Sequence, residues 1–158
     1  MKQYKNVFIS HHGKDDEHIK KLKDLLKSKD YVLRNSSIDS SKPNEANSDP
    51  YIQKLLRDGI KWAGTTLVLI GQNTHTREWV NWEIEQSEKA GNRIVGIYIR
   101  GATDADVPEA FEKFGHALVG WNSDKMIDAI EGKCDDWNKP DGTPWTNRFI
   151  PPRGDCAR

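Results

Sequence analysis

Two stretches of the chain, TTLVLIG at residues 65–71 and RIVGIYI at residues 93–99, consist mostly of apolar side chains. A strand with one face in solvent would alternate apolar and polar residues, so uninterrupted apolar runs of this length are typical of strands covered on both faces. Such strands belong to parallel sheets, because the helices that connect parallel strands lie across both faces of the sheet. The two runs therefore predict an α/β domain built around a central sheet.

The rest of the chain alternates further strand patterns with amphipathic helices. In residues 15–29, for example, Ile19, Leu22 and Leu26 recur at helical spacing. Five strands joined by right-handed helical crossovers favour a flavodoxin-like three-layer sandwich, with a five-stranded parallel sheet in the order 2-1-3-4-5. We expect strands at 6–10, 31–35, 65–71, 93–99 and 116–121, and helices at 15–29, 48–63, from Arg77 onward, 107–115 and 123–132.

The C-terminal part of the chain departs from this pattern. Residues 132–158 hold four of the seven prolines. We therefore assign residues 1–131 to the domain and expect an irregular tail at 132–158 that packs on the domain or extends from it. Trp137, Trp145 and Phe149 are the side chains that could attach this tail to the domain.

Composition limits the partners and the compartment. Lys plus Arg and Asp plus Glu number 24 each, and this balance gives no global field for a polyanion, so we expect no nucleic acid and no membrane as partners. No apolar run approaches the roughly 18 residues of a membrane span, and the N-terminus has no export signal, so we expect a cytoplasmic protein. In that compartment Cys134 and Cys156 are expected to be free thiols, with no bound metal.

In the predicted fold, ligands bind at the carboxyl ends of the first and third strands, where the strand order reverses. Three common occupants of such a site lack their motifs here. A single glycine, Gly13, follows the first strand in place of the G-x-G-x-x-G of dinucleotide-binding domains, and no Walker loop occurs. The third strand ends in LVLIGQN, with no aspartate to accept a phosphoryl group. The sequence therefore disfavours these three classes of protein.

Other side chains are placed at this edge of the sheet. The sequence SHH at residues 10–12 ends the first strand, and a polar loop at residues 35–49 follows the second. In the helix after the third strand, Trp79 and Glu83 are four residues apart, so their side chains lie on one face of the helix, one turn apart. An aromatic ring and a carboxylate are thus expected side by side.

Three motifs together resemble a TIR domain, and in particular the TIR-like (ThsB-like) proteins of the bacterial Thoeris antiphage system. They are VFIS at 7–10, WVNWEI at 79–84, which contains the W-x-x-x-E pattern, and GNRIVGIYI at 91–99. The resemblance covers roughly residues 5–131. The loop RNSSIDSSKPNEANSDP lacks the glycine-proline core of signalling-adaptor TIR domains, which argues against recognition of the adaptor kind.

The resemblance implies an enzyme that cleaves the nicotinamide–ribose bond of NAD+, with NAD+ as substrate, no separate cofactor, and Glu83 as the catalytic residue. The product would be linear ADP-ribose or, if the loop excludes water, a cyclic ADP-ribose isomer that signals to a downstream effector protein. A homo-oligomer is a further expectation. The side chains that we expect around the substrate are Phe8, Ser10, His11, His12, Asp39, Trp79 and Trp82.

Two other functions stay open on the sequence. The chain could be a non-catalytic TIR interaction module, or a nucleoside deoxyribosyltransferase-like enzyme, which shares the topology and uses a glutamate nucleophile. Trp82 can also be read as a packing residue. Successive helix residues turn by about 100°, so Trp82 points well away from Trp79 and is expected to pack against a neighbouring helix.

Overall fold

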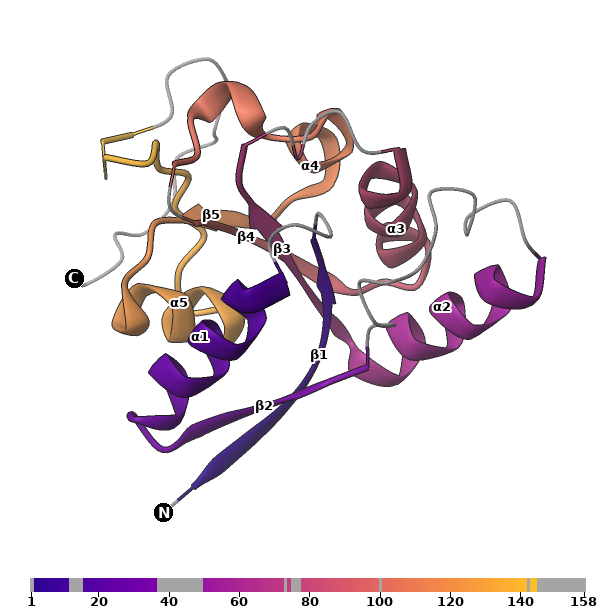
Figure 1. Cartoon of the computed structure of the whole chain (residues 1–158), viewed down its shortest axis with the longest axis horizontal. Coiled ribbons are helices and arrows are strands. Elements are labelled where there is room, and N and C mark those ends of the chain that lie inside the picture. The colour runs from indigo at the N-terminus through magenta and orange to yellow at the C-terminus, as the bar shows by residue number, and fades with distance from the viewer. Residues whose placement is uncertain are drawn as a thin grey trace.

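The computed structural model describes residues 2–11, 16–36, 50–72, 74, 78–99, 101–141 and 143–144 of the 158-residue chain. Within these residues the centre is a sheet of five parallel strands in the order β2-β1-β3-β4-β5 (Figure 1). This order and direction confirm the predicted flavodoxin-like sheet. The strands are β1 (Gln3–Ser10), β2 (Tyr31–Asn35), β3 (Thr65–Ile70), β4 (Arg93–Tyr98) and β5 (Ala117–Val119).

Helices connect the strands and cover both faces of the sheet. α1 and α5 pack on one face, whereas α2, α3 and α4 pack on the other, which gives three layers (Figure 1). None of the described helices is both long enough and apolar enough to cross a membrane. Their bounds are α1 (Asp16–Lys27), α2 (Pro50–Ala63), α3 (Glu78–Lys89), the 3-10 helix η4 (Asp104–Asp106), α4 (Glu109–Phe114) and α5 (Ser123–Ile130).

Successive side chains of each central strand point to opposite layers. In β1, Val7 and Ile9 belong to the cluster under α1 and α5, whereas Phe8 packs toward α2. In β3, Leu67 points to the first of these layers and Val68 to the layer of α3 and α4. All five side chains are buried. The central strands therefore have no solvent-facing side, which is why their sequences are continuously apolar.

β1 and the edge strand β5 differ in length from the prediction. β1 begins at Gln3, three residues earlier than expected, because its polar first residues pair with β2, where Gln3 lies opposite Tyr31. These residues lie toward the edge of the sheet, so burial does not select apolar side chains there. At the other edge, β5 is limited to three residues, Ala117–Val119.

Part of the predicted tail runs beside β5. Two backbone hydrogen bonds of 2.9 and 2.8 Å join Leu118 to the residues on either side of Trp137. The Trp137 side chain is only 5% exposed, and its ring centroid lies 5.0 Å from that of Phe111. Trp137 therefore contributes to the core, whereas Trp145 and Phe149 lie outside the described residues.

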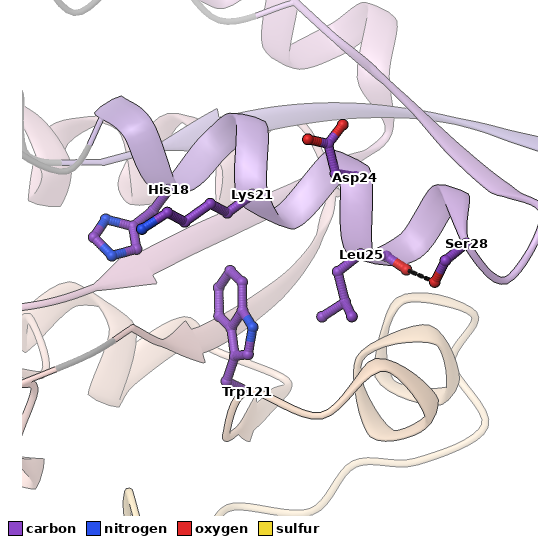
Figure 2. Close-up of a pocket in the computed structure, with 6 residues that line it drawn as sticks. All are labelled: His18, Lys21, Asp24, Leu25, Ser28 and Trp121. Carbon is purple, nitrogen blue, oxygen red and sulfur yellow. Dashed lines mark hydrogen bonds between the residues drawn. The ribbon is translucent and has the colours of Figure 1, made fainter.

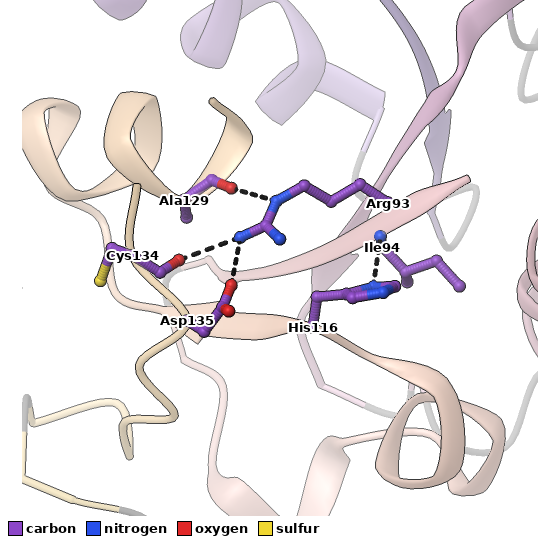
Figure 3. A network of polar contacts seen from close by, with 6 residues as sticks. All are labelled: Arg93, Ile94, His116, Ala129, Cys134 and Asp135. Carbon is purple, nitrogen blue, oxygen red and sulfur yellow. Dashed lines mark hydrogen bonds and ion pairs between the residues drawn. The ribbon is translucent and has the colours of Figure 1, made fainter. Parts of the chain in front are cut away.

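Arg93, the first residue of β4, joins the end of α5 to the segment that follows it. Its Nε donates a hydrogen bond to the carbonyl oxygen of Ala129 at 2.6 Å, and its Nη2 donates to that of Cys134 at 3.0 Å (Figure 3). The same Nη2 pairs with Oδ1 of Asp135 at 2.6 Å. A guanidinium presents several donors in a fixed geometry, so this one side chain sets the path of the chain toward Trp137.

His116 supports the neighbouring start of β4. Its Nδ1 accepts a hydrogen bond from the backbone N–H of Ile94 at 3.0 Å (Figure 3). Partial burial of the ring lowers the pKa of His116, and the positive charge of Arg93 lowers it further. Only a neutral imidazole has a nitrogen that can accept a hydrogen bond, so the lowered pKa favours the form that this contact requires.

The expectation of free thiols is wrong for Cys134, which is disulfide-bonded. The chain has one other cysteine, Cys156, which lies outside the described residues. The expectation rested on the compartment inferred from the N-terminus, and such an argument does not indicate which sulfur atoms the fold brings together.

Gly96 in β4 marks a close approach of the α4 layer to the sheet. A Cβ atom on this residue would lie 2.7 Å from Cζ of Phe111 and 2.8 Å from Cδ1 of Leu118. Because both neighbours are fully buried, we predict that Gly96→Ala lowers the free energy of unfolding by about 1–3 kcal/mol. Urea unfolding measures the change.

Gly120→Ala is the matched control. The nearest atom to a new Cβ at this position is the carbonyl oxygen of Pro140, at 3.8 Å. We expect a change of less than about 0.5 kcal/mol. Equal losses in the two variants would show that the tight packing at Gly96 does not matter for stability.

Candidate active site

Ser10 and Glu83 meet at the carboxyl end of the sheet. Ser10 is the last residue of β1, and Glu83 lies in the second turn of α3. The hydroxyl of Ser10 donates a hydrogen bond to Oε1 of Glu83 at 2.7 Å. The strand order reverses between β1 and β3, so this pair lies where folds of this type bind their ligands.

Neither residue is accessible to solvent. The exposed fraction is 0% for Glu83 and 1% for Ser10. Removing a carboxylate from water opposes folding unless hydrogen bonds or charges compensate for the lost hydration. Glu85 on the same helix is exposed, as is usual for a helical glutamate. The burial of Glu83 therefore indicates a carboxylate that the fold holds in one position.

Trp79 makes a second contact between α3 and the end of β1. Its Nε1 donates a hydrogen bond to the carbonyl oxygen of His11 at 3.3 Å, and its half-buried ring packs against the core beneath α3 and α4. His11 itself is buried. Since Ser10 ends β1 and His11 is the next residue, Glu83 and Trp79 contact adjacent residues at the end of this strand. This confirms that the two side chains share one face of α3.

Trp82 and Phe8 lie on the α2 side of the same region. Trp82 is half-buried and packs against the cluster that contains Phe8, Leu56 and Ile60. The guanidinium carbon of Arg57 lies 5.6 Å from the centroid of the Trp82 ring, a cation–π contact between α2 and α3. The structure thus agrees with a packing role for Trp82. Contact of either aromatic residue with a substrate stays a prediction.

Two predicted site residues, His12 and Asp39, lie outside the described residues, as does most of the loop at 35–49. The first two residues of that loop are described: Asn35 is the last residue of β2, and Ser36 follows it. Oδ1 of Asn35 accepts a hydrogen bond from the β1 backbone at 3.1 Å, and the N–H of Ser36 donates to the β1 backbone at 3.0 Å. The start of this connection is therefore held against β1 as far as Ser36.

A chain of buried hydroxyl and amide groups anchors α3 behind Glu83. Oγ of Ser87 donates a hydrogen bond to the carbonyl oxygen of Glu83 at 2.8 Å and lies 2.6 Å from Oγ1 of Thr66 in β3. Nδ2 of Asn92 donates to Oγ1 of Thr66 at 3.3 Å and to the carbonyl oxygen of Ile60 in α2 at 2.9 Å. These bonds link β3, α2 and α3.

The sequence patterns above did not identify this chain of contacts, although two signals were present. Ser87 follows Glu83 by four residues, the spacing that also separates Glu83 from Trp79. Thr66 is, with Thr65, one of the two polar residues at the start of an otherwise apolar strand. Polar side chains at buried positions almost always have hydrogen-bond partners. Thr66 and Ser87 were therefore candidates for a hydrogen bond to each other.

The coupling between Thr66 and Ser87 can be measured. We predict that Thr66→Val and Ser87→Ala each lower the free energy of unfolding by about 1–2 kcal/mol, because each removes a partner from buried polar groups. The double variant should lose less than the sum, since the two hydroxyls bond to each other. Urea unfolding of the four proteins tests this, with the exposed Ser28→Ala as control. Strictly additive losses would contradict the coupling.

Two solved structures resemble this chain at low sequence identity. The TIR domains of the activated Roq1 resistosome directly recognizing the pathogen effector XopQ are 19% identical, with 60% of this chain and 57% of that chain covered and a TM-score of 0.40. The SEFIR domain of IL-17 receptor B is 11% identical, with 81% of this chain and 93% of that chain covered and a TM-score of 0.49.

A curated relative shares more of its sequence over a shorter stretch. The protein named "Putative cyclic ADP-D-ribose synthase ThsB1" of Bacillus cereus (strain MSX-D12) is 40% identical over 57 residues. The match takes in 36% of this chain and 30% of that relative, so more than two thirds of the relative lies outside it.

The family model described as "Thoeris protein ThsB, TIR-like domain" matches residues 8–104. This range is more than half of the chain and extends from β1 to the start of η4. It includes Ser10, Trp79 and Glu83. The chain therefore belongs to the TIR-like domain family of the Thoeris protein ThsB.

Proposed function

We propose that this protein cleaves the bond between nicotinamide and ribose in NAD+, with Glu83 as the catalytic residue. The observation that carries the proposal is the buried Glu83 carboxylate, whose Oε1 accepts a hydrogen bond of 2.7 Å from the Ser10 hydroxyl. The pair lies at the carboxyl ends of the strands, where folds of this type bind ligands. Family membership supports the same class of reaction, because the ThsB1 relative bears the name of a cyclic ADP-D-ribose synthase.

One fixed carboxylate suits this reaction. The nicotinamide ring is cationic in NAD+ and leaves as a neutral molecule, because its nitrogen takes the electron pair of the broken bond. No general acid is needed, and the positive charge passes to the ribose, which becomes oxocarbenium-like in the transition state. A negative charge placed against the ribose stabilises this transition state more than it stabilises the bound substrate.

The ribose cation must then be captured by a nucleophile. Water gives ADP-ribose and a proton, whereas a nitrogen or hydroxyl of the same nucleotide gives a cyclic ADP-ribose isomer and a proton. We propose the cyclic product. It requires a site from which water is excluded, and the long connection between β2 and α2 is of the length that often forms a lid. Among the described side chains, Trp79 is the one best placed to help exclude water from the site.

Substrate can reach Glu83 only after some local movement, since the residue has no exposed surface. Trp79 covers the end of β1 through a hydrogen bond of 3.3 Å to His11, longer than the 2.9–3.0 Å typical of such bonds. We propose that Trp79 moves when NAD+ binds and then lies against the nicotinamide or the ribose. An activating trigger, or association of several copies, would act by favouring this open state.

The biological role follows from the family and from the nature of the product. A cyclic nucleotide that leaves the enzyme can act as a signal only if another protein binds it. We therefore propose that the product activates a separate effector protein in the cytoplasm as part of antiphage defence. The small family-matched domain would then be the part that generates the signal.

Glu83→Gln is predicted to lower the rate of nicotinamide release by about 100-fold or more without changing the melting temperature. Glutamine keeps the shape of the side chain and an oxygen that can accept the Ser10 hydrogen bond, so the main loss is the negative charge. Glu85→Gln is the matched control, because it makes the same change at an exposed position of the same helix. Chromatography after incubation with NAD+ measures nicotinamide.

Full activity in a folded Glu83→Gln variant would contradict the catalytic role. The two alternative functions give different results in the same assay. A nucleoside deoxyribosyltransferase would leave NAD+ intact and exchange the bases of deoxynucleosides, and a non-catalytic interaction module would consume neither substrate.

The two tryptophans of α3 should respond differently to truncation. Trp79→Ala should reduce turnover more than stability, because the side chain adjoins the end of β1 beside Glu83. Trp82→Ala should mainly reduce stability, by about 1–3 kcal/mol for a half-buried ring, because it packs between α2 and α3. The melting temperature and the nicotinamide release of both variants show which tryptophan affects stability and which affects turnover. A stable, inactive Trp82→Ala beside an unstable, active Trp79→Ala would reverse the assignment.

A further inference from the structure

A groove on the face of the sheet opposite Glu83 has no role in the proposed reaction. It lies between α1 and the connection from β5 to α5, and its volume is about 770 Å³ (Figure 2). Glu83 belongs to α3, in the layer on the other side of the sheet. The groove is lined by His18, Lys21, Asp24, Leu25, Ser28 and Trp121.

One edge of α1 forms a wall of this groove. His18, Lys21 and Leu25 are spaced by three and four residues, so they lie along one stripe of α1, and Ser28, just after the end of the helix, continues it. A separate set of α1 side chains, which includes the fully buried Leu22, packs on the sheet. Leu25 of the stripe is partly buried against the same core cluster, and all four residues of the stripe line the groove.

Trp121 forms the opposite wall. Trp121 follows β5 and precedes Asn122, whose side chain caps the N-terminus of α5. The backbone of Trp121 therefore lies directly before the start of α5. The ring is 41% exposed. It meets His18 edge to face, with ring centroids 6.4 Å apart and an angle of 79° between the planes. An exposed indole held in this way offers a flat surface on which another ring can stack.

The charge of the groove is uneven. Lys21 has no ion pair among the residues that the structure describes, whereas the Asp24 carboxylate pairs with Lys20 at 3.7 Å. Figure 2 shows the Lys21 amine beside the His18 ring and above the indole of Trp121, while the Asp24 carboxylate points to the other side of α1. A positive charge that has no ion pair within the described residues thus lies next to the aromatic wall, and Leu25 supplies an apolar wall beyond it.

We propose that this groove binds a small, planar aromatic molecule that carries a negative charge. The ring would stack on Trp121 and contact Leu25, and the anionic group would pair with Lys21. A purely inorganic anion would leave the apolar walls unused, and a neutral hydrocarbon would leave Lys21 without a partner. The volume is in the range of pockets that take small organic ligands. The proposal does not depend on the reaction at Glu83.

Two dyes with the same ring system test this proposal on the full chain. 1-Anilinonaphthalene-8-sulfonate carries a sulfonate, and N-phenyl-1-naphthylamine lacks it. Fluorescence titration should give one sulfonate dye bound per folded chain. Trp121→Ala should weaken binding of the sulfonate dye about tenfold. Lys21→Glu should weaken it about fivefold and leave the affinity for the neutral dye unchanged.

Matched control variants are available on α2, across the sheet. Trp62 is a 50% exposed tryptophan and Lys61 an exposed lysine. Trp62→Ala and Lys61→Glu should leave both affinities unchanged, and melting temperatures report the folding of each variant. Should Trp121→Ala lower the melting temperature, the exposed Lys21→Glu decides by itself.

Two results would overturn the proposal. Unchanged affinity for the sulfonate dye in both Trp121→Ala and Lys21→Glu would show that the groove does not bind aromatic anions. An equal loss of affinity for the charged and the neutral dye in Lys21→Glu would show that no anion is recognised.

Discussion

Glu83 has an exposed fraction of 0% and accepts a hydrogen bond from Ser10, and this contact joins the end of β1 to the helix that carries the W-x-x-x-E pattern. A buried carboxylate opposes folding unless its surroundings fix it and satisfy its oxygens. The Ser10 hydroxyl supplies one such hydrogen bond, while Trp79, packed beneath α3 and α4, and Trp82, packed toward α2, hold the helix that carries Glu83. In the proposed reaction the carboxylate would thus be in position before the substrate binds, which is the condition under which electrostatic stabilisation of a transition state is most effective.

Contacts at the back of α3 help to position Glu83 in addition to the hydrogen bond from Ser10. Thr66 in β3 and Ser87 in α3 are linked by a hydroxyl contact of 2.6 Å, and Asn92 extends this link to α2. All three are buried in the described structure, so the register of the helix on the sheet is fixed by directional bonds in addition to hydrophobic packing. A change in that register would move the carboxylate relative to the end of β1. On the opposite face, α1 and α5 complete the core and leave a separate groove at their edge.

The architecture could be predicted from sequence because burial on both faces leaves a direct record in a parallel strand, namely an uninterrupted apolar run. The shared face of Trp79 and Glu83 followed from helical spacing alone. The pairing of Thr66 with Ser87 could not be predicted in this way, because it depends on how one element sits on another, and no local period specifies that. The disulfide of Cys134 was missed for a related reason. An argument from the cellular compartment says nothing about the distance between two sulfur atoms in the folded chain.

Incubation of the protein with NAD+ tests the central claim most directly. The measurement is mass spectrometry coupled to chromatography, after incubation of NAD+ with the folded protein at increasing concentration. The account predicts nicotinamide and, in equal amount, a nucleotide lighter than ADP-ribose by one molecule of water. NAD+ that remains intact at every protein concentration would contradict the account, and ADP-ribose as the sole nucleotide product would contradict the exclusion of water from the site.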